Sequence, residues 1–168
     1  MAGSLNDILV EPICEENEKI IDEVIKRKMM TVAGVTVDLL HEMEKNFGPR
    51  VREIVFEMTQ NQEVSLRDDF GTPEEDLKNF CASIDHMAAG SHRWEKGIDE
   101  PDQIGYNFTR CMYAEVFCEL GEPDLGLILC ATDKSWVESY NPKLKFQRTK
   151  VLMNGDEMCD HLYRIEKE

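Results

Sequence analysis

The sequence predicts an α+β fold, in which a helical N-terminal half packs on a small antiparallel sheet formed by the C-terminal half. Apolar residues recur at helical spacing up to about residue 90, for example from Val51 to Met58. Late in the chain, side chains over 144–149 alternate in the manner of a strand. Because 168 residues suit one domain, we expect a single unit spanning 1–168, with a helical part at 1–90 and an α+β part at 91–168.

Several helices are expected in the N-terminal part. An apolar stripe runs through Glu15–Met30, and a second stretch from Thr31 repeats the same spacing. Gly48-Pro49 then supplies a glycine stop and a proline restart before the next helix. After a polar loop at Glu63–Gly71, Thr72-Pro73-Glu74-Glu75 forms a capping box with proline at the first helical position.

The second half of the chain changes character. Two short segments, Trp94–Glu100 and Ile104–Thr109, are separated by a turn sequence and predict a hairpin. Met112–Leu120 and Pro123–Tyr140 are each predicted to form one helix. A turn at 154–156 leads to a last strand at Met158–Ile165.

The charge balance narrows the classes of partner. The chain has 34 Asp and Glu against 19 Lys and Arg, for a formal net charge of −15, which disfavours binding to nucleic acid and to anionic membranes. Met1–Pro12 lacks the pattern of a signal peptide, and the longest apolar run, Leu125–Ala131, is too short to span a bilayer. We therefore expect a cytoplasmic protein whose partner is neither nucleic acid nor a membrane. The oligomeric state is not predicted.

The six cysteines include no Cys-x-x-Cys pair. Without a secretion signal they are expected to be free thiols, and the strongest zinc and redox spacings are missing. We therefore predict no cofactor and no metal ligand, although a metal-binding or redox Cys-His protein stays an alternative. Cys81 lies on an apolar helical stripe and is expected in the core, and Cys118 is expected to fill space as well.

Cys111 is the cysteine whose local sequence favours a nucleophile. It lies where a strand should give way to a helix, so the helix dipole and the neighbouring Arg110 are both expected to lower the pKa of its thiol. Cys111, Glu115 and Cys118 are spaced i, i+4, i+7 and should share a helix face. A buried structural thiol is the alternative for Cys111, and an ion pair with Arg110 or Arg148 is the alternative for Glu115.

Two further pairs of residues point to the same region. Cys130 and Asp133 are three residues apart on the helix predicted at Pro123–Tyr140, with Asp133 either facing solvent or serving as a base or as the group that orients a histidine. Cys159 and His161 alternate on the last strand and therefore face the same side of the sheet. The alternative for His161 is a structural place in the core.

Several motifs of the C-terminal part follow one another in a specific order. They are Phe108–Glu115, Leu120–Pro123, Cys130 with Asp133, Asn141-Pro142, Arg148-Thr149, Leu152-Met153, Gly155-Asp156 and Cys159-Asp160-His161. Together they resemble the L-2-amino-thiazoline-4-carboxylic acid hydrolase family over roughly residues 100–165. The resemblance implies a small-molecule substrate and hydrolysis of a cyclic C=N bond: water adds at C2 of an aminothiazoline ring, the ring C–S bond opens, and N-carbamoyl-cysteine forms.

For this activity we expect one pocket in which a Cys111 thiolate, or a water activated by His161, attacks the amidine-like carbon. Asp133 would orient His161, and Arg148 or Arg110 would hold a substrate carboxylate. The predicted catalytic residues are Cys111, Asp133, Cys159 and His161, and the predicted substrate-binding residues are Arg110, Glu115, Cys130 and Arg148. A second hypothesis is a small-ligand-binding or sensor domain that uses the same pocket without turnover.

Overall fold

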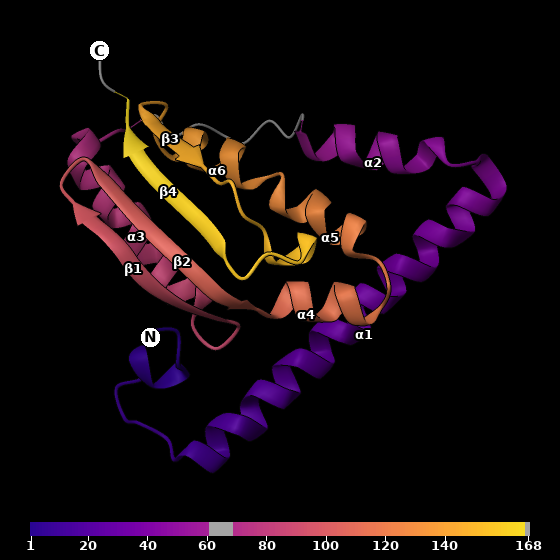
Figure 1. Ribbon diagram of the computed structural model, residues 1–168, viewed down its shortest axis with the longest axis horizontal. Helices are drawn as coiled ribbons and strands as arrows, with labels where there is room; N and C mark the ends of the chain where they lie inside the picture. Colours follow the sequence, from indigo (N-terminus) through magenta and orange to yellow (C-terminus); the bar gives the residue numbers. More distant parts are fainter. Residues whose placement is uncertain (61–68, 167–168) are drawn as a thin grey trace.

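A computed structural model describes residues 1–60 and 69–166 and has the predicted α+β architecture, with helices first and an antiparallel sheet later (Figure 1). The helices are α1 (Glu15–Phe47), α2 (Arg50–Gln60), α3 (Pro73–Ala88), α4 (Met112–Glu119), α5 (Pro123–Cys130) and α6 (Asp133–Tyr140), with short 3₁₀ turns η1 (Leu5–Asp7) and η2 (Leu152–Asn154). The strands are β1 (His92–Glu100), β2 (Gln103–Cys111), β3 (Leu144–Gln147) and β4 (Cys159–Ile165). Most of the predicted polar loop at Glu63–Gly71 lies outside the described residues.

The four strands form one antiparallel sheet in the order β1-β2-β4-β3. The predicted hairpin is therefore confirmed as β1 and β2, and the last strand pairs between β2 and β3. The register sets Phe108 beside Cys159 and Tyr106 beside His161. These pairings carry the aromatic side chains of β2 and the Cys-His strand to the same part of the sheet.

Helix α3 packs on the sheet and closes the first part of the core. Its buried Leu77, Phe80 and Cys81 belong to one apolar cluster with buried residues of β2 and β4. Tyr106 on β2 donates a hydrogen bond from its hydroxyl to the carbonyl of Cys81 at 3.1 Å. Cys81 is 1% exposed, which confirms its predicted place in the core.

The predicted helix stop at Gly48 and the predicted capping box at Thr72 are confirmed, whereas Pro49 precedes α2 and is not its first residue. The Thr72 hydroxyl accepts from the backbone N–H of Glu75 at 3.3 Å, and the Glu75 carboxylate accepts in return from the N–H of Thr72. Gly48 ends α1 with a φ of 84°, and Gly155 ends η2 with a φ of 89°. Both angles lie in the region that favours glycine, which explains the choice of residue at these two stops.

The N-terminal helix differs from the prediction in length and in the face that it buries. The two stretches around Met30 form one continuous helix, because no proline interrupts them and the Thr31 hydroxyl donates to the carbonyl of Arg27 at 3.0 Å and does not cap a new helix. The buried positions are Ala33, Val37 and Leu40, which pack with α2, α4 and α5, whereas Val35 is 65% exposed. The predicted apolar stripe is thus largely on the surface, because α1 packs beside the other helices and not on the sheet (Figure 1).

The single helix predicted at Pro123–Tyr140 is wrong, because the chain forms α5 and α6 with a break between them. Thr132 turns the chain there: its backbone N–H and its hydroxyl both donate to the carbonyl of Leu129, at 3.2 and 2.7 Å. A hydroxyl that bonds a preceding carbonyl competes with regular helical hydrogen bonding. The break places Cys130 at the end of one helix and Asp133 at the start of the next.

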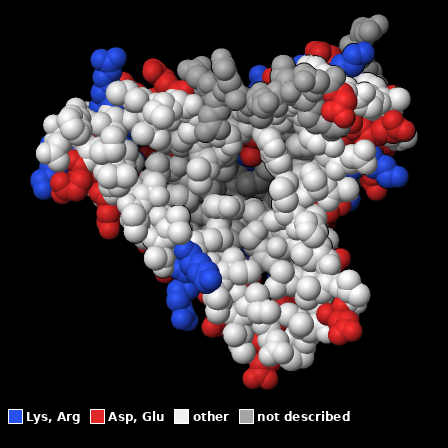
Figure 2. All heavy atoms as spheres, turned by 180° about the vertical axis from the view of Figure 1, so that it is seen from behind, with Lys and Arg blue, Asp and Glu red and all other residues white. Residues whose placement is uncertain are grey.

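The surface agrees with the acidic composition. Seen from behind, Asp and Glu side chains lie mostly around the periphery, and the centre of this face is largely uncharged (Figure 2). Within the described ranges, no helix has both the length and the apolar character that a bilayer crossing requires.

Candidate active site

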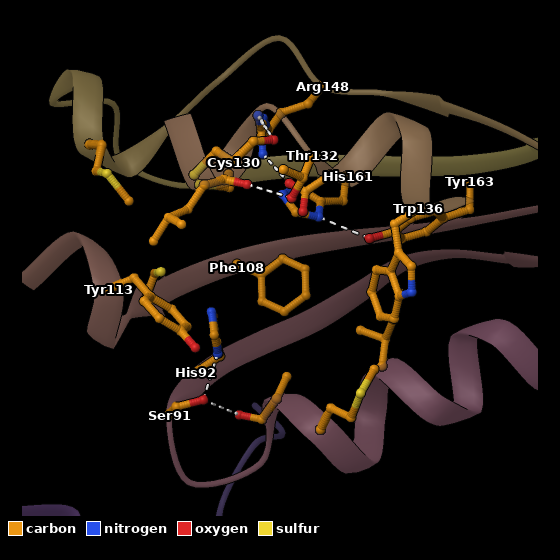
Figure 3. Close-up of a pocket in the computed structure, with 18 residues that line it drawn as sticks. Ser91, His92, Phe108, Tyr113, Cys130, Thr132, Trp136, Arg148, His161 and Tyr163 are labelled. Carbon is orange, nitrogen blue, oxygen red and sulfur yellow. Dashed lines mark hydrogen bonds and ion pairs between the residues drawn. The ribbon is translucent and has the colours of Figure 1, made fainter. Parts of the chain in front are cut away.

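One cavity of about 430 Å³ lies between α3, the sheet and the segment from α4 to α6 (Figure 3). It gathers six of the eight predicted site residues: Cys111, Cys130, Asp133, Arg148, Cys159 and His161. The remaining lining residues are Ile84, Met87, Ala88, Ser91, His92, Phe108, Tyr113, Leu129, Thr132, Trp136, Met153 and Tyr163. Most of these are aromatic or aliphatic, which is the usual composition of a small-molecule pocket.

The last strand supplies a cysteine and a histidine to this cavity. Cys159 and His161 alternate on β4, and both line the cavity, as their two-residue spacing predicts. Asp160, between them, lies on the other face and accepts hydrogen bonds from the backbone N–H groups of Thr149 and Lys150 at 2.7 and 2.5 Å. The strand therefore separates a structural carboxylate from two cavity side chains.

A partly buried ion pair in the wall joins Arg148 to Asp133. Nη1 of Arg148 donates to Oδ2 of Asp133 at 2.6 Å, and Nη2 donates to the carbonyl of Cys130 at 3.0 Å. Burial raises the pKa of Asp133, while the guanidinium of Arg148 opposes that shift. The prediction that Asp133 orients His161 is wrong in this structure, because in the described part of the chain the side chain of Asp133 bonds Arg148 instead.

His161 is paired with a tyrosine. Its Nδ1 lies 3.0 Å from the hydroxyl of Tyr163, two residues along β4. The ring contacts Phe108 and Phe146, with centroid separations of 4.9 and 5.0 Å. Burial lowers the pKa of His161 to about 3, and the positive charge of Arg148 adds to that effect, so the imidazole is neutral near pH 7.

A second histidine, His92, faces the same cavity and was missed by the sequence reasoning. Its Nδ1 lies 2.8 Å from Oγ of Ser91, and Ser91 Oγ donates to the carbonyl of Ala88 at 3.2 Å. Figure 3 shows the ring pointing into the cavity, with its second nitrogen directed away from Ser91. Burial lowers the pKa of His92 to about 4. The predicted hairpin could have included His92, but its first strand was expected to begin at Trp94, two residues after the observed start of β1.

Cys111 occupies the predicted position but not the predicted electrostatic state. It is the N-cap residue of α4, and the backbone N–H groups of Ala114 and Tyr113 act to lower the pKa of its thiol. Burial outweighs them and raises that pKa to about 12. The expected activation of the thiol is therefore contradicted, because the loss of hydration destabilises the thiolate more than the N–H groups of the first helical turn stabilise it.

Arg110 and Glu115 do not line the cavity, contrary to their predicted substrate-binding roles. The guanidinium of Arg110 donates two 2.9 Å hydrogen bonds to the carboxylate of Asp22 on α1, and also bonds Glu115. Glu115 thus forms the ion pair with Arg110 that was its alternative explanation, and Lys26 lies 3.6 Å from the same carboxylate. This cluster ties α1 to α4.

The remaining cysteines divide into cavity walls and surface. Burial raises the pKa of Cys130 to about 11 and raises that of Cys159. The Cys159 sulfur accepts from the backbone N–H of Leu152 at 3.2 Å. Cys118 is exposed, so its expected role as filler is wrong. No cluster of three or more His, Cys, Asp or Glu suited to a metal ion occurs among residues 1–60 and 69–166.

Comparison with known proteins gives one clear relationship. No curated protein matches the chain. A solved structure, the phenol-responsive sensory domain of the transcription activator PoxR with phenol, aligns at a TM-score of 0.41 and 10% identity, covering 76% of this chain and 71% of that chain. The model of the L-2-amino-thiazoline-4-carboxylic acid hydrolase family matches residues 24–163, so the chain belongs to that family.

Proposed function

We propose that the protein hydrolyses a small cyclic amidine that also carries a carboxylate, such as L-2-amino-thiazoline-4-carboxylate. The observation that carries this proposal is the Arg148–Asp133 pair in the wall of a cavity that also holds two neutral imidazoles. Family membership agrees with the proposal, since the family is described by that reaction.

The substrate's charges match this pair. An aminothiazoline ring is a basic amidine, so with its carboxylate the molecule is a zwitterion with no net charge. The Arg148–Asp133 pair is likewise neutral as a whole. In the proposed complex, Arg148 receives the carboxylate and Asp133 receives the amidinium, each through charge-assisted hydrogen bonds. A purely anionic ligand would leave one charge uncompensated in a buried site, which is costly.

The proposed reaction adds one water. The water oxygen bonds to C2 of the ring, the C2–S bond breaks, and the product is N-carbamoyl-cysteine. Water is the favoured nucleophile, because a thiol with a pKa near 12 is almost wholly protonated at pH 7. Cys111, Cys130 and Cys159 then serve as walls that exclude bulk water.

The test is product formation with purified protein. L-2-Amino-thiazoline-4-carboxylate is incubated with the wild type, and N-carbamoyl-cysteine is measured by mass spectrometry. We expect turnover that is strongly reduced in Asp133→Asn and Arg148→Gln. Arg164→Gln is the matched control, because Arg164 is an exposed arginine on β4 that does not line the cavity. Wild-type protein that forms no product from this compound, or from related cyclic amidines, overturns the proposal.

A second candidate function is ligand binding without turnover. It is supported by the uncharged state of the cavity's cysteines and histidines: burial raises the pKa values of the three thiols and lowers those of both histidines. Neutral thiols and imidazoles can contact a small molecule without reacting with it. Calorimetric binding of the amidine at micromolar concentration, together with no product over a day, would favour this role over catalysis.

A further inference from the structure

We infer that the two histidines of the cavity are held in opposite tautomers, so that His92 presents a lone pair at Nε2 and His161 presents an N–H at Nε2. Their use in catalysis rests on the proposed function, but the tautomers themselves do not. The inference comes from the hydrogen-bond partners that hold each Nδ1 atom.

The tautomer of His92 follows from the single proton of Ser91. That hydroxyl donates to the carbonyl of Ala88, so the Ser91 oxygen can only accept from Nδ1 of His92. The Ala88 carbonyl also acts to raise the pKa of His92, as an acceptor beside a protonated nitrogen does. Nδ1 therefore carries the proton, and Nε2 carries the lone pair.

The tautomer of His161 follows from the hydroxyl of Tyr163. Tyr163 is 4% exposed, and in the described ranges its hydroxyl has one hydrogen-bond partner, Nδ1 of His161. Burial raises the pKa of Tyr163 far above its ordinary value, so the hydroxyl keeps its proton. A buried O–H without an acceptor is costly. Tyr163 therefore donates, Nδ1 accepts, and the ring proton of His161 is on Nε2.

The two rings are close enough to act on one small ligand. The ring of Phe108 contacts both imidazoles, with centroid separations of 5.6 Å to His92 and 4.9 Å to His161. Both histidines line the same cavity, one on β1 and the other on β4 (Figure 3). A lone pair and an N–H thus meet in one space with the Arg148–Asp133 pair.

This arrangement gives the two histidines different roles in the proposed hydrolysis. As the water oxygen bonds to C2 of the amidinium, Nε2 of His92 takes one water proton and the C=N electron pair moves to the ring nitrogen. When the C2–S bond breaks, the sulfur keeps the bonding pair and takes that proton from His92. The hydroxyl proton on C2 leaves to solvent as the C=O forms. His161 keeps its own proton and donates a hydrogen bond to the departing sulfur, as a neutral imidazole can.

The tautomers are measurable without any substrate. In protein labelled with ¹⁵N-histidine, two-bond proton–nitrogen spectra distinguish a protonated ring nitrogen from one with a lone pair, and His92→Gln and His161→Gln assign the signals. We expect Nε2 to be of the lone-pair type in His92 and of the protonated type in His161. Two histidines with the same tautomer would overturn the inference.

A tyrosine variant tests whether the Tyr163 hydroxyl sets the tautomer of His161. Tyr163→Phe removes the donor to Nδ1 and is expected to shift the His161 signals towards the other tautomer. Tyr113→Phe is the matched control, because Tyr113 lines the cavity and its ring lies 6.1 Å from that of His92, yet its hydroxyl bonds neither histidine within the described residues. It should leave both sets of signals unchanged. His161 signals that are unaltered in Tyr163→Phe would contradict the role of Tyr163 as the positioning residue.

The catalytic assignment has its own readout. If the wild type turns over the amidine, His92→Gln should lower kcat by roughly 10²- to 10⁴-fold, the usual effect of removing a general base, while calorimetry still detects binding. A His92→Gln variant with wild-type kcat sinks the assignment of the base. If the wild type shows no turnover, the proposed function is wrong, and the proton–nitrogen spectra still determine the two tautomers independently.

Discussion

Arg148 Nη1 lies 2.6 Å from Asp133 Oδ2, and the two side chains are 13% and 30% exposed. The residues come from different elements: Asp133 begins α6, and Arg148 directly follows β3. Their contact therefore closes the cavity wall as well as balancing its charge. Each partner would be left as a partly buried, uncompensated charge if the other were removed.

Arg148→Gln and Asp133→Asn should each lower the free energy of unfolding, by roughly 1–3 kcal/mol, because a hydrogen bond to a charged group is lost and a desolvated partner is left behind. The double variant should lower the free energy of unfolding by less than the sum of the two single effects, since it leaves neither charge without a partner. Urea unfolding followed by circular dichroism measures all three. Strict additivity of the two single effects would argue that the pair has no energetic coupling.

Cys111, whose local sequence favoured a nucleophile, should react more slowly than the exposed cysteines. Burial holds the pKa of Cys111 near 12 and that of Cys130 near 11, whereas Cys14 and Cys118 are exposed. With iodoacetamide at pH 7, Cys14 and Cys118 should be modified well before Cys111, as read by peptide mass spectrometry over time. Fastest modification at Cys111 would restore the activated thiolate and remove the argument for water as the nucleophile.

The parts of the site that follow from local geometry were predictable. Cys159 and His161 share a face because strand side chains alternate, and that rule needs no tertiary information. Cys111 was correctly expected where a strand meets a helix. Its ionisation was not, because the cost of burial depends on how α4, α5 and η2 close over it, and no local pattern reports that enclosure.

Other parts of the site depended on contacts between distant segments. Arg110 was expected near a substrate, yet its partner is Asp22, 88 residues earlier in the chain. Asp133 was placed on the wrong helix but still reaches the cavity, because the break at Thr132 turns it inward. His92 was missed because its role depends on the hydrogen bond of its neighbour Ser91 to Ala88 at the end of α3, which residue spacing does not reveal.

The stability of the protein should depend on pH through its two cavity histidines. Burial lowers the pKa of His92 to about 4 and that of His161 to about 3, from 6.5, so between these limits the unfolded chain binds more protons than the folded one. Their contribution is complete above about pH 6.5 and declines as the pH falls, by about 1 kcal/mol per pH unit for each histidine.

Urea unfolding between pH 7 and pH 4.5 measures this contribution. His161→Phe should weaken the loss of stability at low pH, since phenylalanine takes up no proton and fits beside Phe108 and Phe146. The control is His86→Gln, at an exposed position on α3, which should keep the wild-type dependence. An identical pH dependence in His161→Phe and the wild type would show that this histidine is not held neutral by burial.

Two helical glycines give a direct test of how tightly the cavity wall is packed. A Cβ at Gly126 on α5 would lie 2.2 Å from the sulfur of Met153, which lines the cavity, and 3.0 Å from Cβ of Phe117. Gly126→Ala should therefore destabilise the fold by roughly 1–3 kcal/mol through overpacking. At Gly34 on α1, a Cβ would meet no atom of the described residues within 4 Å, so Gly34→Ala should stabilise by roughly 0.5–1 kcal/mol through helix propensity. The two substitutions should shift the melting temperature in opposite directions, because the added methyl group enters a filled space in α5 and open space beside α1. If Gly126→Ala stabilised the protein, Met153 would have to move aside at little cost in free energy, and this wall of the cavity would be easily deformed.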